Sequence, residues 1–321
     1  MPKAFAIIGH ERQRADLEAD LVNGNIAHAY LFEGPAHIGK FTIARWFARQ
    51  VLTRGLPPER AEAVLGAMDR LLHPDDLVLD RLWIEDRCDD WAVIARSSNV
   101  PQEHRQKAGM RSDTISIDDV RIIQERLHET GTGMYRCCCI RSVERMQEPA
   151  ANALLKILEE PPPGRVFLLT TQSIGALPPP VVSRARVLRF RKLPASAMAP
   201  LVTGLGDDDA RFLLHLSQGA PGLLQLLKSD PDALLRERQA HAQAAAVWQA
   251  RPAETLKLLA ALRERGPESD RFLLHLAMTL RAMRGRPAQW AAAFDDLARG
   301  LATNAQRDLL LQRFALSKGG A

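Results

Sequence analysis

Apolar positions in the first 192 residues follow two alternating patterns. Short runs rich in apolar residues predict strands at residues 28–34, 73–84, 137–140, 165–171 and 186–190. Apolar residues spaced three or four apart predict helices at residues 11–24, 41–52, 59–72, 117–130 and 148–160. Because strands alternate with helices, we expect a parallel sheet with crossover helices. The most apolar strands suit a sheet that is covered on both faces.

Three stretches carry more specific predictions. The helix at 41–52 has an apolar face made of Ile43, Trp46, Phe47 and Val51. Asp118 is the predicted N-cap of a later helix. The apolar face of that helix consists of Val120, Ile123 and Leu127. The polar stretch 96–113 is predicted to be irregular and exposed.

Beyond residue 192 the pattern predicts helices alone. Helical spacing continues, as in Phe272, Leu276 and Leu280, and no further strand pattern occurs. Glycine and proline interrupt the helices near residues 204–209, 219–222, 251–252, 266–267 and 285–287. The sequence therefore predicts an α/β domain over residues 1–192, a small helical domain over 193–235 and a helical bundle over 236–321.

Length and composition indicate a globular protein of two or three domains, with 321 residues, 46% hydrophobic and 25% charged. No run of 18 apolar residues predicts a membrane span, and the N-terminal segment becomes charged too early for a signal peptide. We therefore expect a cytoplasmic protein with no membrane partner. The net charge of +5 permits contact with nucleic acid without requiring it, and aromatic residues suited to base stacking make up only 5%.

Cysteines and histidines do not predict a metal site. The four cysteines are Cys88, Cys137, Cys138 and Cys139, and no C-x-x-C spacing occurs. Adjacent cysteines on a strand point to opposite faces, so we expect buried apolar cysteines. No two of the nine histidines stand three or four residues apart. We expect no zinc and no other bound metal.

The segment GPAHIGKF, residues 34–41, approaches the phosphate-binding P-loop G-x-x-x-x-G-K-[ST]. Gly34, Gly39 and Lys40 match this motif, and a predicted strand and helix flank it as a P-loop requires. Phe41 stands where a hydroxyl would bind Mg²⁺. The candidate nucleotide-binding residues are therefore Gly34, Gly39 and Lys40, in a loop that lacks one metal ligand.

The order of several segments resembles the clamp-loader branch of the AAA+ proteins, and within it the delta-prime subunit family of the bacterial DNA polymerase III. The segments that carry the resemblance are IIGHERQ (7–13), HAYLFEGPAHIGK (28–40), HPD (73–75), ISIDDVR (115–121), ERMQEPAANALLKILEEPPPGRVFLLTT (144–171) and LPPPVVSRARVLRF (177–190). The match extends over residues 5–192, and beyond it only helical content and LSQGAPGLL agree.

This resemblance implies a fold, an assembly and a role. The fold is a RecA-like AAA+ parallel sheet with helices, then a helical lid and an all-α collar that joins subunits into a ring; these are the three predicted parts. The partners are motor and delta-type clamp-loader subunits of the DNA polymerase III holoenzyme. The motors use ATP to open the sliding clamp and close it on primed DNA, which this chain meets through the assembly. Delta-prime subunits do not hydrolyse ATP.

Several positions that the family uses for ATP hydrolysis are altered. His37 replaces a usual glycine, and we expect its side chain to block the conformation that aims amides at phosphate. Arg141 and Ser142 replace the two acids that follow the strand at 137–140, and a cation at Arg141 would repel Mg²⁺. Glu144 matches a later acid, Thr171 or Gln172 takes the sensor position, and Leu223 replaces the lid arginine.

These departures leave three interpretations of the loop: a vestigial turn, nucleotide binding without turnover, or an active ATPase motor. The loss of Mg²⁺ ligands at Phe41 and Arg141 favours the first, so we expect a subunit that is not an ATPase and requires no cofactor. A nucleic-acid-binding module on an AAA+ scaffold is another alternative, and it predicts salt-dependent binding of primed DNA by the chain alone. The four-cysteine zinc module common in the family is absent, since residues 41–87 contain no cysteine.

The resemblance assigns one catalytic role, to the pair Ser183 and Arg184. In the family this pair projects its arginine into the ATP site of the next subunit, where a guanidinium stabilises transition-state charge. The basic strand that follows carries Arg186, Arg189 and Arg191, which contact DNA phosphates or pair at a domain interface.

Overall fold

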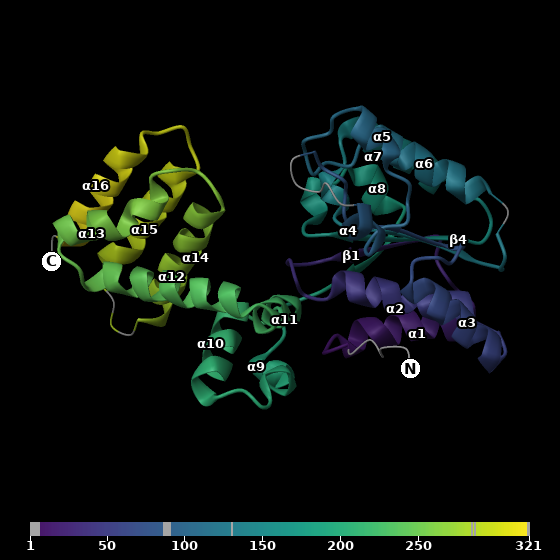
Figure 1. The fold of residues 1–321 in the computed structure, drawn as a ribbon, viewed down its shortest axis with the longest axis horizontal. Coiled ribbons are helices and arrows are strands. Elements are labelled where there is room, and N and C mark those ends of the chain that lie inside the picture. The colour runs from purple at the N-terminus through teal and green to yellow at the C-terminus, as the bar shows by residue number, and fades with distance from the viewer. Residues whose placement is uncertain (1–6, 86–90, 130, 284, 286, 320–321) are drawn as a thin grey trace. The chain divides into compact units, whose positions relative to one another are not determined.

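The computed structural model describes residues 7–85, 91–129, 131–283, 285 and 287–319 (Figure 1). Contacts divide the chain into two compact units, Met1–Gln225 and Leu226–Ala321. Each unit is described by itself below. The predicted division into three parts, with boundaries after 192 and 235, stays a prediction.

The first unit is built on a sheet of five parallel strands. They are β1 (Ala29–Glu33), β2 (Asp76–Leu79), β3 (Arg136–Ile140), β4 (Arg165–Thr171) and β5 (Arg186–Arg189). Their spatial order is β2-β3-β4-β1-β5, with all pairs parallel. The expected parallel α/β sheet is confirmed.

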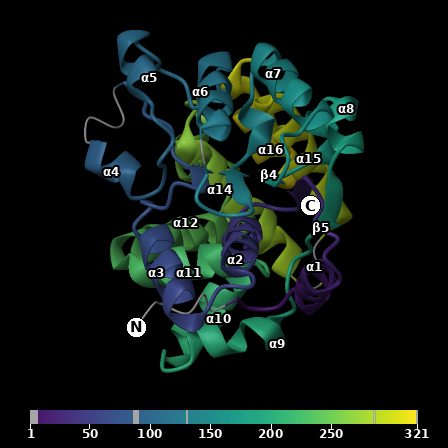
Figure 2. The ribbon, with the colours of Figure 1, turned by 90° about the vertical axis from the view of Figure 1, so that its right-hand side faces the viewer.

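Helices cover both faces of this sheet (Figures 1 and 2). One face carries α1 (Glu11–Asn23), α2 (Lys40–Thr53) and α3 (Pro58–Asp69). The other carries α4 (Trp91–Ala95), α5 (Glu103–Lys107), α6 (Ile117–His128), α7 (Glu148–Glu159) and α8 (Pro179–Ser183). Successive strand residues alternate between two cores: Leu31 and Cys138 lie in one, and Tyr30 and Phe32 in the other. The strands are apolar throughout because both sides are buried.

The three consecutive cysteines are buried along β3, as expected of apolar cysteines. Burial raises the pKa of the thiols of Cys137 and Cys138. Cys88 lies outside the described residues.

The prediction that residues 96–113 are irregular and exposed holds for much of the stretch but is wrong at α5 and at four buried residues. The stretch contains α5, whose Arg105 is fully buried. The Arg105 guanidinium donates to the carbonyl oxygen of Trp83 at 2.9 Å and to Asp119 Oδ2 at 2.7 Å. Polar composition predicted exposure, but buried polar groups are tolerated where hydrogen bonds satisfy them.

The predicted N-cap Asp118 is also wrong. Ser116 caps α6: its hydroxyl accepts a hydrogen bond from the Asp119 amide at 3.3 Å, and the Asp119 carboxylate accepts one from the Ser116 amide at 2.7 Å. This reciprocal pair is a capping box. The predicted apolar face of α6 is confirmed, since Val120, Ile123 and Leu127 are buried.

All described residues after β5 are helical or irregular, as predicted. The first unit ends with α9 (Ala195–Met198), α10 (Asp207–Ser217) and the start of α11 (Pro221–Ser229). The second contains α12 (Pro231–Gln249), α13 (Pro252–Leu258), α14 (Pro267–Ala282), α15 (Ala288–Leu301) and α16 (Arg307–Gly319), packed around Trp248, Phe272, Leu276 and Phe314. Across the described residues, every helix is too short or too polar to cross a lipid bilayer.

Candidate nucleotide site and surface arginine

The candidate nucleotide site lies where three loops meet at the carboxyl edge of the sheet. Because β3, β4 and β1 are neighbours, the loops that follow them converge. A cavity of about 300 Å³ lies there, lined by His37, Lys40 and Phe41 from the first loop and helix, by Arg141 from the second and by Gln172 from the third. The sheet therefore brings together most of the residues that the sequence singled out.

The loop after β1 is a tight turn with positive φ angles at three residues. Gly34 has φ 153°, and a Cβ there would lie 2.5 Å from the carbonyl oxygen of Phe190, so only glycine fits. Gly39 has φ 100° and precedes the first residue of α2. His37 adopts a left-handed φ of 57°. A side chain at this position therefore does not prevent a left-handed backbone, and the expectation that it blocks the conformation that aims amides at phosphate stays a prediction.

Lys40 is turned back onto the loop. Only 8% of the residue is exposed, and its Nζ donates to the carbonyl oxygens of Gly34 at 2.7 Å and Pro35 at 2.6 Å. The pKa of Lys40 falls to about 8, mainly because burial disfavours the charged ammonium; Glu144 opposes this shift and the Arg141 guanidinium adds to it. The ammonium is occupied by loop carbonyls that a phosphate would have to replace.

Phe41 and Arg141, the two replaced Mg²⁺ positions, contact each other. The Arg141 guanidinium carbon lies 5.7 Å from the centroid of the Phe41 ring, a cation–π distance. Arg141 Nη1 also lies 2.8 Å from Asp80 Oδ1. The guanidinium and the Phe41 ring thus both line the cavity.

The remaining polar groups do not complete a Mg²⁺ site. Both carboxylate oxygens of Glu144 are shielded from solvent and accept no hydrogen bond from the described residues. Thr171 is buried and its hydroxyl donates to the carbonyl oxygen of Ser173 at 3.0 Å, so of the two predicted sensor positions only Gln172 lines the cavity. With a phenyl ring and a guanidinium at two ligand positions, the residues present do not fit Mg²⁺, which requires oxygen ligands.

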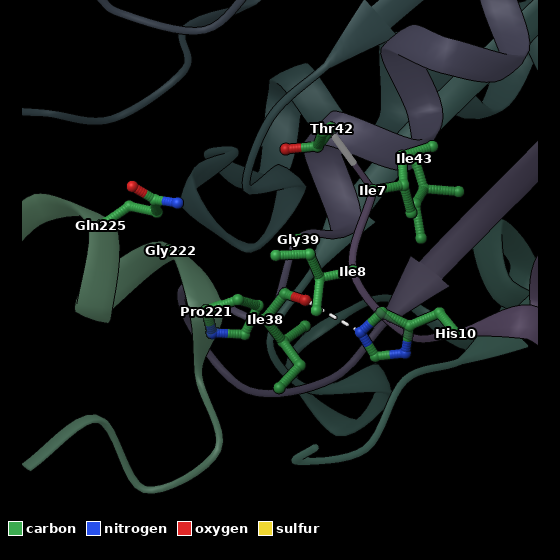
Figure 3. Close-up of a pocket in the computed structure, with 10 residues that line it drawn as sticks. All are labelled: Ile7, Ile8, His10, Ile38, Gly39, Thr42, Ile43, Pro221, Gly222 and Gln225. Atoms are coloured by element: carbon green, nitrogen blue, oxygen red, sulfur yellow. Dashed lines mark hydrogen bonds between the residues drawn. The ribbon is translucent and has the colours of Figure 1, made fainter. Parts of the chain in front are cut away.

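An apolar pocket of about 120 Å³ adjoins this cavity (Figure 3). It shares Ile38, Gly39, Thr42 and Gly222 with the cavity and is otherwise lined mainly by Ile7, Ile8, Ile43 and Pro221. His10 Nε2 lies 2.9 Å from the carbonyl oxygen of Ile38, as the dashed line in Figure 3 shows. The amide of Gly222 donates to the carbonyl oxygen of His37 at 2.8 Å, which fastens α11 to the loop.

Arg184 lines neither the cavity nor the apolar pocket and lies on the surface at the end of α8. Its side chain is 36% exposed and forms an ion pair with Glu159 of α7 at 2.9 Å. Its Nη1 also donates to the carbonyl oxygen of Pro180 at 3.1 Å, and the Ser183 hydroxyl donates to the same oxygen at 3.0 Å. The structure therefore holds Ser183 and Arg184 together and does not bring them to Lys40.

The basic strand makes contacts within its own unit. Arg186 forms an ion pair with Asp20, which also accepts a hydrogen bond from the Tyr30 hydroxyl at 2.9 Å. Arg189 lies 3.9 Å from Glu33. Arg191 is exposed and forms no ion pair with the other described residues.

Comparison with known families identifies the chain's relatives. A family model described as DNA polymerase III, delta subunit, matches residues 9–194, more than half of the chain. The chain belongs to this DNA polymerase III delta subunit family. The matched region of the chain contains the loop after β1, the cavity residues that follow β3 and β4, and Arg184.

Two curated relatives show how far the family likeness extends. DNA polymerase III subunit delta′ of Pseudomonas aeruginosa is 32% identical over 210 residues, which cover 63% of this chain and 56% of the relative. DNA polymerase III subunit tau of Bacillus subtilis is 24% identical over 246 residues, covering 74% of this chain. The chain spans only 36% of the length of that tau protein.

One solved structure supports the fold. A DNA polymerase III gamma subunit-related protein of Thermotoga maritima matches with a TM-score of 0.51 and 18% identity, covering 96% of this chain and 98% of that one. This likeness supports the predicted fold class, a parallel α/β sheet with helices followed by helical parts.

Sequence reasoning missed the apolar pocket as a site. Ile7, Ile8 and His10 lie in the segment that carried the family resemblance, yet they were not assigned a role. The one sequence signal for the pocket is the apolar pair Ile7 and Ile8, followed by Gly9 and His10. These residues lie beside Pro221, more than 200 residues later, because α11 begins next to the loop in the fold.

Proposed function

We propose that this chain is a non-hydrolysing subunit of a bacterial clamp loader that donates Arg184 to the ATP site of a neighbouring subunit. The observation that carries the proposal is the contact of Arg141 with Phe41 in the chain's own cavity. A nucleotide-hydrolysing P-loop protein holds Mg²⁺ with a hydroxyl and an acid at these two places. Here an aromatic ring and a cation stabilise each other instead.

The position of Arg184 supports the second half of the proposal. Its ion pair with Glu159 joins side chains that are 36% and 44% exposed, and such pairs contribute at most about 1 kcal/mol. A γ-phosphate of a neighbour therefore competes easily for the guanidinium. Nη1 of the arginine donates to the carbonyl oxygen of Pro180 at 3.1 Å and to the Ser183 hydroxyl at 3.5 Å, which holds it at the end of a short helix without burying it.

The family supports the assembly part of the proposal. We infer that the chain joins motor and delta-type subunits in a ring within the DNA polymerase III holoenzyme, in the cytoplasm, and that it reaches the sliding clamp and primed DNA through that ring. Its contribution is to complete a neighbour's site and to provide a fixed member of the ring. Neither task needs nucleotide turnover by this chain.

Nucleotide binding without turnover is a second candidate. The apolar pocket beside the loop favours it, because Ile8, Ile38 and Pro221 offer a planar base an apolar slot next to Lys40. The Lys40 ammonium would then leave the carbonyl oxygens of Gly34 and Pro35 for phosphate. This candidate leaves the role of Arg184 unchanged.

Reconstitution tests the assembly. The purified chain is mixed with the tau- or gamma-type and delta-type subunits of the same organism and separated by size-exclusion chromatography with light scattering. We expect one complex that contains this chain, and we expect Arg184→Ala to enter it equally, because Arg184 makes only exposed contacts here. If the chain elutes alone under conditions where the other subunits assemble, the proposed function is wrong.

A further inference from the structure

A groove of about 770 Å³ lies at the amino ends of the strands, whereas the candidate nucleotide site lies at their carboxyl ends. The end of α2, one side of α3 and the segments that lead into β2 and β3 line it. These segments precede their strands, whereas the nucleotide loops follow theirs. In a parallel sheet the two kinds of loop lie at opposite edges, so the groove is independent of Lys40 and Arg184.

The floor and rim of the groove are apolar. Val51 belongs to the core between the sheet and α2, and Leu52, Val64 and Tyr135 pack against that core. Met134 on the rim is 81% exposed. Exposed apolar side chains around a hollow of this size indicate a surface that gains from being covered.

The wall that carries Met134 is fixed in place. The buried carboxylate of Asp75 accepts hydrogen bonds from the hydroxyl of Thr132 at 2.5 Å and from the amides of Thr132 and Gly133, both at 2.9 Å. Arg136 Nε donates to the other oxygen of the same carboxylate at 3.0 Å. A preformed wall lowers the ordering cost of binding.

The groove presents positive charge beside its apolar floor. Arg54 and Arg60 line it and are exposed, and neither forms an ion pair with another described residue. Asp75, the acid among the lining residues, is 1% exposed and its charge is already matched by Arg136. The charge offered to a ligand is therefore that of two guanidinium groups.

We propose that this groove binds a peptide segment of another protein in which large apolar side chains stand beside acidic residues. The apolar floor takes the apolar side chains, and Arg54 and Arg60 pair with the carboxylates, to which a guanidinium can donate two parallel hydrogen bonds. Arginine beside an apolar pocket is a common composition of protein-binding hot spots. A nucleic acid backbone matches the charge but offers nothing for the floor around Val64 and Tyr135.

Three synthetic hexapeptides test this proposal by fluorescence anisotropy with the full chain. They are fluorescein-labelled Glu-Asp-Leu-Phe-Asp-Leu, the same peptide with Lys in place of each acid, and the same peptide with Ala in place of Leu and Phe. We expect the first to bind at least about tenfold more tightly than either other peptide, a difference of about 1.4 kcal/mol. Removing the charge or the apolar side chains should each weaken binding.

Matched protein variants locate the binding. The double variant Arg54→Glu and Arg60→Glu should weaken binding of the first peptide about tenfold or more, and Met134→Ala should weaken it several-fold. The control Arg12→Glu and Arg191→Glu changes the same charge at two exposed arginines outside the groove and should leave affinity within about twofold. Circular dichroism melting confirms that each variant is folded.

Other results would overturn the proposal. They are no binding of the first peptide up to about 1 mM, equal binding of the lysine peptide, or equal weakening by the groove and control variants. Sedimentation that shows a dimer which Met134→Lys dissociates would assign the groove to a second copy of this chain instead.

Discussion

Replacing Arg184 by alanine is expected to reduce ATP hydrolysis at the site that receives it by about 10³-fold or more, the range measured for arginines supplied in trans to GTPases. The reason is that the guanidinium stabilises negative charge that grows on the transferring phosphoryl group. The measurement is DNA- and clamp-stimulated ATP turnover by the reconstituted loader, with this subunit as wild type or variant.

Two further variants separate this role from a general loss of charge. Arg184→Lys keeps the charge but loses the planar pair of donors, so we expect it to recover only a small part of the activity. Arg12→Ala removes an exposed arginine that has no ion pair among the described residues, and it should leave turnover within about twofold. Normal turnover with Arg184→Ala in a correctly assembled loader would contradict the proposed role.

Replacing Asp75 by asparagine is expected to cost the first unit about 3–5 kcal/mol of unfolding free energy, the range for breaking a buried ion pair from one side. Asp75 and Arg136 have side chains that are 1% and 2% exposed, and their contact is 3.0 Å. Asparagine leaves the Arg136 guanidinium buried without its carboxylate. Urea unfolding followed by fluorescence measures the loss.

Asp118→Asn is the matched control for Asp75→Asn. The Asp118 carboxylate is 3.0 Å from Arg121 in a pair whose side chains are 51% and 60% exposed, so its loss should cost less than about 0.5 kcal/mol. Equal costs for the two variants would mean that burial of the Asp75 pair adds nothing to stability.

The same pair predicts a pH dependence. Burial alone would raise the pKa of Asp75, but hydrogen bonds from Thr132 and Arg136 outweigh it and hold the pKa below its ordinary value of 3.8. Because the folded pKa is the lower one, this stabilisation is complete above about pH 4 and is lost as the pH falls through the folded value. The advantage of wild type over Asp75→Asn should therefore shrink only in acid.

The spacing of apolar residues predicted most elements of the first unit, because a buried strand or helix face requires apolar residues at regular positions. It failed where polar side chains are buried with partners that are distant in the sequence. Arg105 is the clearest case: nothing in residues 96–113 reveals that Trp83 and Asp119 satisfy its guanidinium. The cap Ser116 was missed because Asp118 is an equally good cap by residue type.

At the candidate site, too, the sequence did not predict contacts between residues that are far apart along the chain. Phe41 and Arg141 could each be identified as departures from a pattern, but their contact depends on the order of β3, β4 and β1 in the sheet. The pairing of Arg184 with Glu159 likewise depends on how α8 packs beside α7. The groove near Met134 joins segments that lack any shared motif, so only the fold reveals it.

The most direct test of the central claim is Mg²⁺-dependent ATP hydrolysis by the purified chain alone, beside Lys40→Ala, each with Mg²⁺ and with EDTA. Because Arg141 and Phe41 stand where a hydrolysing P-loop protein has its Mg²⁺ ligands, we predict the same background rate in all four reactions. If the wild type turns over ATP with Mg²⁺ and Lys40→Ala does not, the chain is a motor subunit and the proposal that it does not hydrolyse ATP is wrong.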